Sequence, residues 1–118
     1  RLVRKVCRKC ASPANIPPRT LLDLGFTSEE AESVSVMQAR GCELCNGTGY
    51  KGRTGLFEVM GISQDIREMI LARAQSREIK KKAIDQGMIS LRRSGLIKIK
   101  TGVTTIEEVV RVTKENPY

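Results

Sequence analysis

Residues 41–60 read GCELCNGTGYKGRTGLFEVM, and residues 1–10 read RLVRKVCRKC. Each stretch contains one Cys-x-x-Cys pair, and the four cysteines are Cys7, Cys10, Cys42 and Cys45. Two intervening residues let one tight turn present two thiolates to the same ion, and zinc binds four thiolates as a tetrahedron. We therefore predict one structural Zn²⁺ site with all four cysteines as ligands and no open coordination position.

Paired cysteines have three other common uses. A redox Cys-x-x-Cys usually stands alone beside a strand of a βαβ unit, a context that neither pair has here. Disulfides require an oxidising compartment, and no secretory signal is visible. An iron–sulfur centre can use the same four thiolates. Zinc is the interpretation that the spacing favours.

The size and charge of the chain restrict its class. At 118 residues it suits one compact domain or two very small ones, neither of which can rely on a large apolar core. The formal net charge is +8, and four thiolates with one Zn²⁺ would lower it to about +6. Such an excess suits an acidic partner, a nucleic acid or an anionic membrane surface, although lysines on helices are often simply a solvated face.

No apolar run approaches the ~20 residues of a membrane-spanning helix, and no signal peptide follows the basic start. We therefore expect a soluble, cytoplasmic protein. The chain begins without Met, as though within an element, which predicts a piece cut from a longer protein.

The segment between the cysteine pairs has clear start and stop signals. Thr27 and Glu30 form a T-x-x-E capping box, which predicts a short helix over residues 28–33. The other elements expected here are a loop over 12–18, a helical turn over 21–24 that ends at Gly25, and a strand over 34–37.

After the second pair, Gly47, Gly49 and Gly52 spell G-x-G-x-x-G. A dinucleotide site needs a strand before this motif and a helix after it, whereas here the motif follows a cysteine turn and leads into a strand-like stretch, Arg53–Met60. We therefore assign these glycines to the turn and not to phosphate binding.

Helical periodicity begins at Ser63 and continues to the end of the chain. Ser63, Ser76 and Ser90 are predicted N-caps, and Thr105 with Glu108 forms a second capping box. These signals predict four short amphipathic helices forming a small bundle. The predicted apolar positions are Ile66, Met69, Ile70, Ile79, Ala83, Ile84, Leu91, Leu96, Ile99, Ile106, Val109, Val110 and Thr113.

Two further predictions concern packing in this region. Gly95, in the middle of a helix, costs about 1 kcal/mol relative to Ala and predicts a close helix contact. Met60, Met69 and Met88 are expected to fill the core and not to bind a ligand.

Catalytic side chains are not recognisable in the sequence. There is no His, no P-loop lysine motif and no pair of carboxylates in an apolar pattern. Glu107 and Glu108 are expected to be first-turn acids of the last helix, and the serines named above are caps. We therefore expect that the chain alone is not an enzyme and that it has no catalytic or nucleotide-binding residue.

Both cysteine stretches together closely resemble the C-terminal region of the type II secretion and type IV pilus assembly ATPases, hexameric cytoplasmic motors related to general secretion pathway protein E. The segments IREMI, EIKKKAIDQGMISLRRSGL and GVTTIEEVVRVT also fit that pattern, so the resemblance covers nearly the whole chain. Retraction ATPases of the same superfamily generally lack the four cysteines. The chain therefore resembles an assembly or secretion motor.

The resemblance implies that the four cysteines bind zinc in a small subdomain inserted into a RecA-like ATPase. The family's nucleotide-binding elements would lie before Arg1, so ATP and Mg²⁺ belong to the parent protein and not to this piece. The parent would couple ATP hydrolysis to pseudopilin or pilin assembly, as a cytoplasmic protein peripheral to the bacterial inner membrane. Type II secretion and type IV pilus assembly share this pattern, so the sequence does not separate them.

The implied partners are the remainder of the parent ATPase, neighbouring subunits of its hexamer and cytoplasmic parts of inner-membrane platform proteins. Two other classes of cysteine-rich module share some of these features. A zinc-ribbon nucleic-acid module would explain the charge, but such modules interleave aromatic residues, which make up 3% here. The cysteine-rich module of J-protein chaperones uses four Cys-x-x-Cys-x-Gly-x-Gly repeats, whereas CELCNGTG is one.

The predicted fold class is α+β, with a small tetracysteine zinc subdomain with short strands followed by a small helical bundle. We expect residues 1–6 to end an element of a preceding ATPase core, residues 7–60 to form the zinc subdomain, and residues 61–118 to form the helical subdomain.

Overall fold

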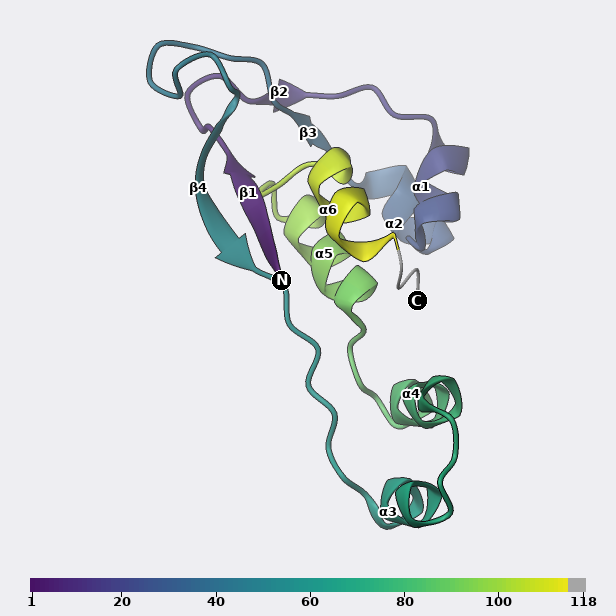
Figure 1. The fold of residues 1–118 in the computed structure, drawn as a ribbon. Coiled ribbons are helices and arrows are strands. Elements are labelled where there is room, and N and C mark those ends of the chain that lie inside the picture. The colour runs from purple at the N-terminus through teal and green to yellow at the C-terminus, as the bar shows by residue number, and fades with distance from the viewer. Residues whose placement is uncertain (115–118) are drawn as a thin grey trace.

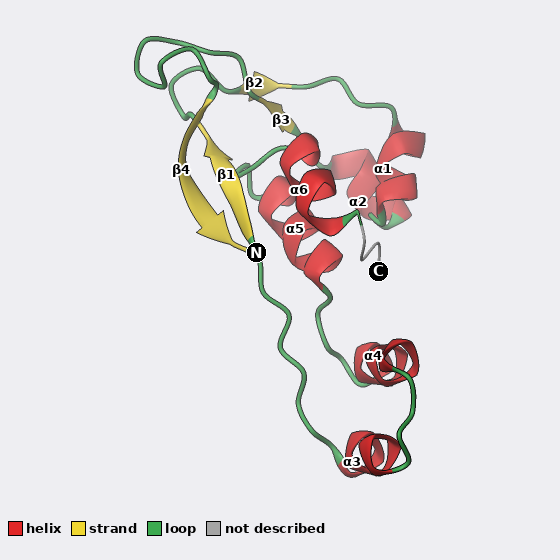
Figure 2. Cartoon of the chain, in the orientation of Figure 1, coloured by secondary structure: helices red, strands yellow, loops and turns green. Residues whose placement is uncertain are grey.

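The computed structural model describes residues 1–114 and shows short strands at one end of an elongated molecule and helices over the rest (Figures 1 and 2). This confirms the predicted α+β class. The elements are β1 Leu2–Val6, β2 Ser12–Pro13, α1 Pro18–Leu24, α2 Ser28–Ser33, β3 Met37–Gln38, β4 Tyr50–Gly55, α3 Gln64–Leu71, α4 Ser76–Asp85, α5 Leu91–Lys100 and α6 Ile106–Thr113.

Two antiparallel strand pairs bring the two cysteine stretches together. β1 pairs with β4, with Leu2 opposite Gly55 and Val6 opposite Tyr50, and the short β2 pairs with β3. The first cysteine pair follows β1, and the second pair precedes β4. Because paired antiparallel strands join opposite chain directions, both turns lie at the same end of the ribbon (Figure 1).

The segment between the cysteine pairs packs against the C-terminal helices. The main core combines side chains from α1, α2 and their flanking loops with side chains from α5 and α6: Leu21, Phe26, Ala31, Val36, Leu96, Ile99 and Val109. A smaller cluster joins the β1–β4 ribbon to the same helices: Val3, Leu56, Leu91 and Val112. Both clusters use side chains of α5 and α6, so these two helices support the segment between the cysteine pairs and the β1–β4 ribbon.

Gly95 makes the close helix contact that its position predicts. A Cβ atom at Gly95 would lie 2.5 Å from Val109 Cγ1 and 3.0 Å from Val109 Cγ2. Real Cβ atoms do not approach other carbons this closely, so α5 and α6 can pack at this distance only with glycine here.

Glu30 ties α2 to α5. The predicted capping box is present: Glu30 N–H donates to Thr27 Oγ1, and the Glu30 carboxylate accepts from Thr27 N–H. The same carboxylate accepts two hydrogen bonds from Arg93, at 2.9 and 2.7 Å, and one from Lys100 at 2.8 Å. These contacts, Arg93 first, hold the pKa of Glu30 well below its usual range.

The C-terminal helices divide into two pairs. α5 and α6 belong to the core described above, whereas α3 and α4 pack on each other around Ile66 and Ala83 and form an arm beyond it (Figure 1). The molecule consequently measures 55 × 29 × 19 Å. Ser63 and Ser90 cap their helices as predicted, but Ser76 is the first residue of α4 and Gln75 is its N-cap.

Several predicted boundaries were wrong. The strand expected over 34–37 is β3 at Met37–Gln38, because Val34 is still the C-cap of α2. The loop expected over 12–18 contains β2, and α1 already begins at Pro18. The strand expected over 53–60 is β4, which starts earlier and ends at Gly55.

The methionines are less buried than predicted. Met60 is exposed and was wrongly assigned to the core, while Met69 and Met88 are half-buried. No helix within residues 1–114 combines the length and apolarity that crossing a membrane requires.

Candidate metal centre

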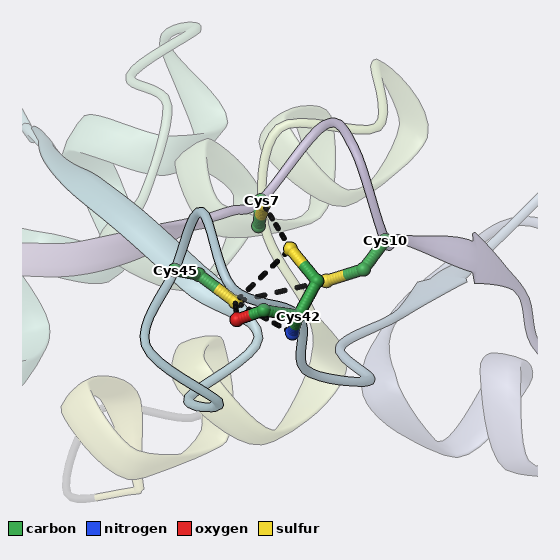
Figure 3. Close-up of side chains that lie close together, drawn as sticks. All are labelled: Cys7, Cys10, Cys42 and Cys45. Carbon is green, nitrogen blue, oxygen red and sulfur yellow. Dashed lines mark hydrogen bonds between the residues drawn. The ribbon is translucent and has the colours of Figure 1, made fainter.

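The four cysteine side chains converge on one point, as Figure 3 shows. Their four Sγ atoms all lie within 4.8 Å of one another. Cys7 and Cys45 are buried, whereas Cys10 and Cys42 are half-buried. The residues predicted as a set from their spacing are therefore together in space, at the end of the β1–β4 ribbon.

Three of the six sulfur–sulfur distances match the edges of a four-thiolate metal site, and all six are within 4.8 Å. Cys7 Sγ lies 3.7 Å from Cys42 Sγ, Cys10 Sγ lies 3.8 Å from Cys45 Sγ, and Cys42 Sγ lies 3.7 Å from Cys45 Sγ. A tetrahedron with Zn–S bonds of about 2.3 Å has S···S edges of about 3.8 Å. A disulfide would require about 2.05 Å, and all four cysteines are free thiols. The cluster could hold a metal ion.

Backbone N–H groups point at the sulfur atoms. Gly41 N–H donates to Cys10 Sγ at 3.3 Å, and both Cys42 N–H and Gly49 N–H donate to Cys45 Sγ at 3.2 Å. Hydrogen bonds of this kind stabilise thiolates and fix the direction of their lone pairs. They constitute the outer shell expected around a metal held by cysteines.

The same contacts separate the pKa values of the thiols. Burial opposes ionisation of Cys45, but the N–H groups of Cys42 and Gly49 outweigh it and lower the pKa of Cys45 to about 6. The pKa of Cys7 is also lowered, because the N–H groups of Lys9 and Cys10 outweigh its burial. Burial raises the pKa of Cys10 to about 11. Cys7 and Cys45 therefore give up their protons more readily than Cys10 does.

Gly49 allows the second turn to close against the chain before it. Its φ is +84°, and a Cβ atom there would lie 2.6 Å from Ala39 Cβ. Any side chain at this position would push the Gly49 N–H away from Cys45 Sγ. Gly47 and Gly49 lie in the turn, as the sequence predicts, and Gly52 lies within β4.

A polar network beside the ribbon was not predicted. The Arg4 guanidinium lies 4.1 Å from the ring centroid of Tyr50, and the Tyr50 hydroxyl lies 2.9 Å from Thr105 Oγ1. Glu108 accepts hydrogen bonds from Arg4 and from Arg111. The network fixes α6 to the strands that carry the cysteine turns.

Glu108 is a first-turn acid of α6, as predicted, but the capping box predicted for Thr105 and Glu108 is only half formed. Thr105 does cap α6 by accepting from Glu108 N–H, but the Glu108 side chain is 2% exposed and binds Arg4 instead of completing a capping box. A signal was available, since Glu108 lies three residues after Thr105 and four before Val112, on the buried stripe of the helix.

Comparison with known proteins identifies the family of the chain. The family model described as "Type II/IV secretion system protein" matches residues 1–111. The chain is 41% identical to the type IV pilus assembly ATPase PilB of Acinetobacter baylyi and 42% identical to PilB of Thermus thermophilus, covering 98% of this chain in both cases. It is 40% identical to the type II secretion system protein E of Aeromonas hydrophila, again over 98% of the chain.

The chain spans 20%, 13% and 23% of the length of these three relatives, respectively. Pilus assembly and type II secretion proteins match at similar identity, so the comparisons place the chain among both groups without choosing between them. With the family model matching almost the entire chain and the four cysteines gathered at one point, this chain belongs to the Type II/IV secretion system protein family.

Proposed function

We propose that the chain is the zinc-binding domain of a secretion or pilus assembly ATPase, with a structural Zn²⁺ held by Cys7, Cys10, Cys42 and Cys45. The observation that carries the metal assignment is the convergence of four thiols whose Sγ atoms lie within 4.8 Å of one another, with three of the six sulfur–sulfur distances at 3.7 to 3.8 Å, the edge length of a four-thiolate tetrahedron. When bound, the ion supplies two positive charges that hold the four thiolates together.

The role of the metal in this proposal is to make the cysteine end rigid. Both turns are short, and the strands leading to them form a ribbon of only two strands, which is marginally stable alone. A structural zinc site of this kind contributes about 10 kcal/mol or more to folding. The metal therefore fixes the projecting end relative to the core on α5 and α6.

In the same proposal the chain is not itself catalytic. It contains no His and no P-loop lysine motif. ATP and Mg²⁺ would bind the rest of the ATPase, and the domain would act as a structural and interaction module of a cytoplasmic hexamer at the inner membrane. Its partners would be neighbouring ATPase subunits and cytoplasmic parts of platform proteins, and the parent would power pilin or pseudopilin assembly.

The test uses the full-length ATPase with Cys10→Ser, and Ser35→Ala in the exposed loop before β3 as the matched control. We expect Cys10→Ser to lose zinc, to form fewer hexamers and to hydrolyse ATP more slowly, while Ser35→Ala keeps all three. Unchanged assembly and hydrolysis in a zinc-free Cys10→Ser protein would contradict the structural role. Efficient ATP hydrolysis by the 118-residue chain alone would contradict its assignment as non-catalytic.

A further inference from the structure

The four sulfur atoms of the candidate metal centre differ in their contacts with backbone N–H groups. Cys45 Sγ accepts from the N–H groups of Cys42 and Gly49, both at 3.2 Å. Cys10 Sγ accepts from the N–H group of Gly41 at 3.3 Å. Among residues 1–114, no backbone N–H group donates to Cys42 Sγ.

Cys42 Sγ instead has two sulfur atoms as its neighbours. Cys7 Sγ and Cys45 Sγ each lie 3.7 Å from it (Figure 3). A hydrogen bond from an N–H group stabilises the negative charge of a thiolate, and the nucleophilicity of a thiolate falls as that charge is stabilised. The thiolate of Cys42 therefore keeps a nucleophilicity that N–H donors reduce at Cys10 and Cys45.

Exposure separates the four thiols further. Cys7 and Cys45 are buried, whereas Cys10 and Cys42 are half-buried. A reagent in solution attacks a thiolate that is both accessible and nucleophilic. Cys42 meets both conditions, while the accessible Cys10 has its sulfur hydrogen-bonded to Gly41.

We propose that Cys42 is an oxidation site, the first thiolate of the centre to be attacked by a hydroperoxide, and that its oxidation dismantles the centre. The inference rests on the proposed function, in which all four cysteines are thiolate ligands of one zinc ion. It adds a chemical difference between ligands that are equivalent in a purely structural site.

The reaction with hydrogen peroxide has two steps. The Cys42 thiolate attacks one peroxide oxygen, the O–O bond breaks, Cys42 becomes a sulfenic acid and hydroxide leaves. The thiolate of Cys7 or Cys45, 3.7 Å away, then attacks the Cys42 sulfur, so that an S–S bond replaces the S–O bond and a second hydroxide leaves. The two sulfur atoms together lose two electrons, and the peroxide gains them.

This oxidation removes two of the four thiolates. The two cysteines that remain cannot complete a tetrahedral four-thiolate site, so the zinc of the proposed function is released. Reduction of the disulfide by a thiol would restore the four ligands. The rigidity of the cysteine end would therefore depend reversibly on the concentration of peroxide around the ATPase.

Limited alkylation of the reduced, zinc-loaded full-length ATPase tests the order of reactivity. Iodoacetamide is suitable because it is uncharged, whereas Arg8 and Lys9 beside Cys10 and Glu43 beside Cys42 would bias a charged reagent. Peptide mass spectrometry gives the extent of reaction at each cysteine. We expect Cys42 to react about tenfold faster than Cys10, since a hydrogen bond to a charged group is strong enough to produce such a difference.

Cys10 is the internal control, because it is half-buried as Cys42 is but accepts an N–H hydrogen bond. A second control is the same protein in denaturant with a chelator, in which all four cysteines should react at similar rates. Equal reactivity of Cys10 and Cys42 in the folded protein overturns the proposal, as does faster reaction of Cys10.

Limited hydrogen peroxide, with a reagent that traps sulfenic acids, tests the reaction itself. We expect the trapped sulfenic acid at Cys42, a first disulfide that includes Cys42, and zinc released in proportion to the thiols lost. A sulfenic acid first trapped at another cysteine, a first disulfide without Cys42, or resistance of the folded centre to peroxide overturns the proposal. Untreated protein without zinc would defeat the proposed function, whereas zinc-loaded protein attacked first at another cysteine would defeat only this inference.

Discussion

Arg4 of β1 and Glu108 of α6 are joined by two hydrogen bonds: the Arg4 backbone N–H donates to Glu108 Oε1 at 2.7 Å, and its guanidinium donates to Oε2 at 3.1 Å. A strand edge and a helix are thereby tied by one buried carboxylate, which also accepts from Arg111. The unpaired edge of β1 at this point is closed by a side chain and not by another strand.

Replacing this carboxylate should destabilise the protein. Glu108→Ala leaves the Arg4 N–H without its acceptor, and we expect the free energy of unfolding to fall by about 2 kcal/mol. The loss is not larger because the Arg4 and Arg111 side chains are half-exposed and can bind water instead. Glu107→Ala, at the neighbouring exposed position of α6, should change stability by less than about 0.5 kcal/mol. Urea unfolding of the zinc-loaded chain measures both, and equal effects would contradict the role of Glu108.

The contribution of Glu108 to the stability of the fold should depend on pH in the acidic range. Burial opposes its ionisation, but the hydrogen bonds from Arg111 and Arg4 outweigh burial and lower the pKa of Glu108 to about 2. Because the pKa of Glu108 is lower in the folded chain than in the unfolded chain, its ionised carboxylate stabilises the fold at pH values above the unfolded-state pKa of about 4.5. This stabilisation is lost as the pH falls towards the folded-state pKa. The stability difference between wild type and Glu108→Gln should therefore be constant above pH about 5 and shrink towards pH about 2. A difference that grows on acidification would contradict this sign.

Gly95→Ala should be destabilising despite the better helix propensity of alanine. Its Cβ would overlap the branched side chain of Val109, and overpacking of this kind costs about 1–3 kcal/mol, against about 1 kcal/mol gained in propensity. Adding Val109→Ala removes the overlapping atoms, so the cost of Gly95→Ala should disappear in that background. Ser94→Ala on the same helix is the control, and thermal unfolding of the four variants checks the pattern. The same cost of Gly95→Ala in both backgrounds would contradict it.

Metal affinity should fall steeply as the pH is lowered. Zinc binds thiolates, so it displaces a proton from Cys10, whose pKa is about 11, at any pH below that value. Each displaced proton weakens binding about tenfold per pH unit on acidification, so the slope is at least tenfold per pH unit and becomes steeper below pH about 6, where Cys45 is also protonated. Competition with a chromophoric chelator between pH 5 and 7.5 measures this slope. Affinity independent of pH would contradict a thiolate site.

Local signals in the sequence predicted the site and most helices. Cys-x-x-Cys spacing constrains two sulfur atoms to one turn, and the caps at Thr27, Ser63 and Ser90 act within three residues, so both are visible without the fold. Gly95 was informative because a helix rarely keeps glycine without a packing reason.

What the sequence did not show depends on contacts between distant residues. The local sequence of Glu108 is that of an ordinary first-turn acid, and its partner Arg4 lies 104 positions earlier in the chain. Glu30 forms its own capping box and gives no indication that Arg93 will also bind it. The end of β4 at Gly55 was missed because strand propensity continues to Met60, whereas strand formation also needs a neighbour.

The most direct test of the account is the metal content of freshly purified, reduced protein, measured by elemental analysis together with thermal unfolding before and after chelation. We predict one zinc per chain, and loss of the cooperative unfolding transition when the zinc is removed. A metal-free protein that unfolds with the same cooperativity and midpoint would contradict the central claim, and stoichiometric iron in place of zinc would contradict the identity of the ion.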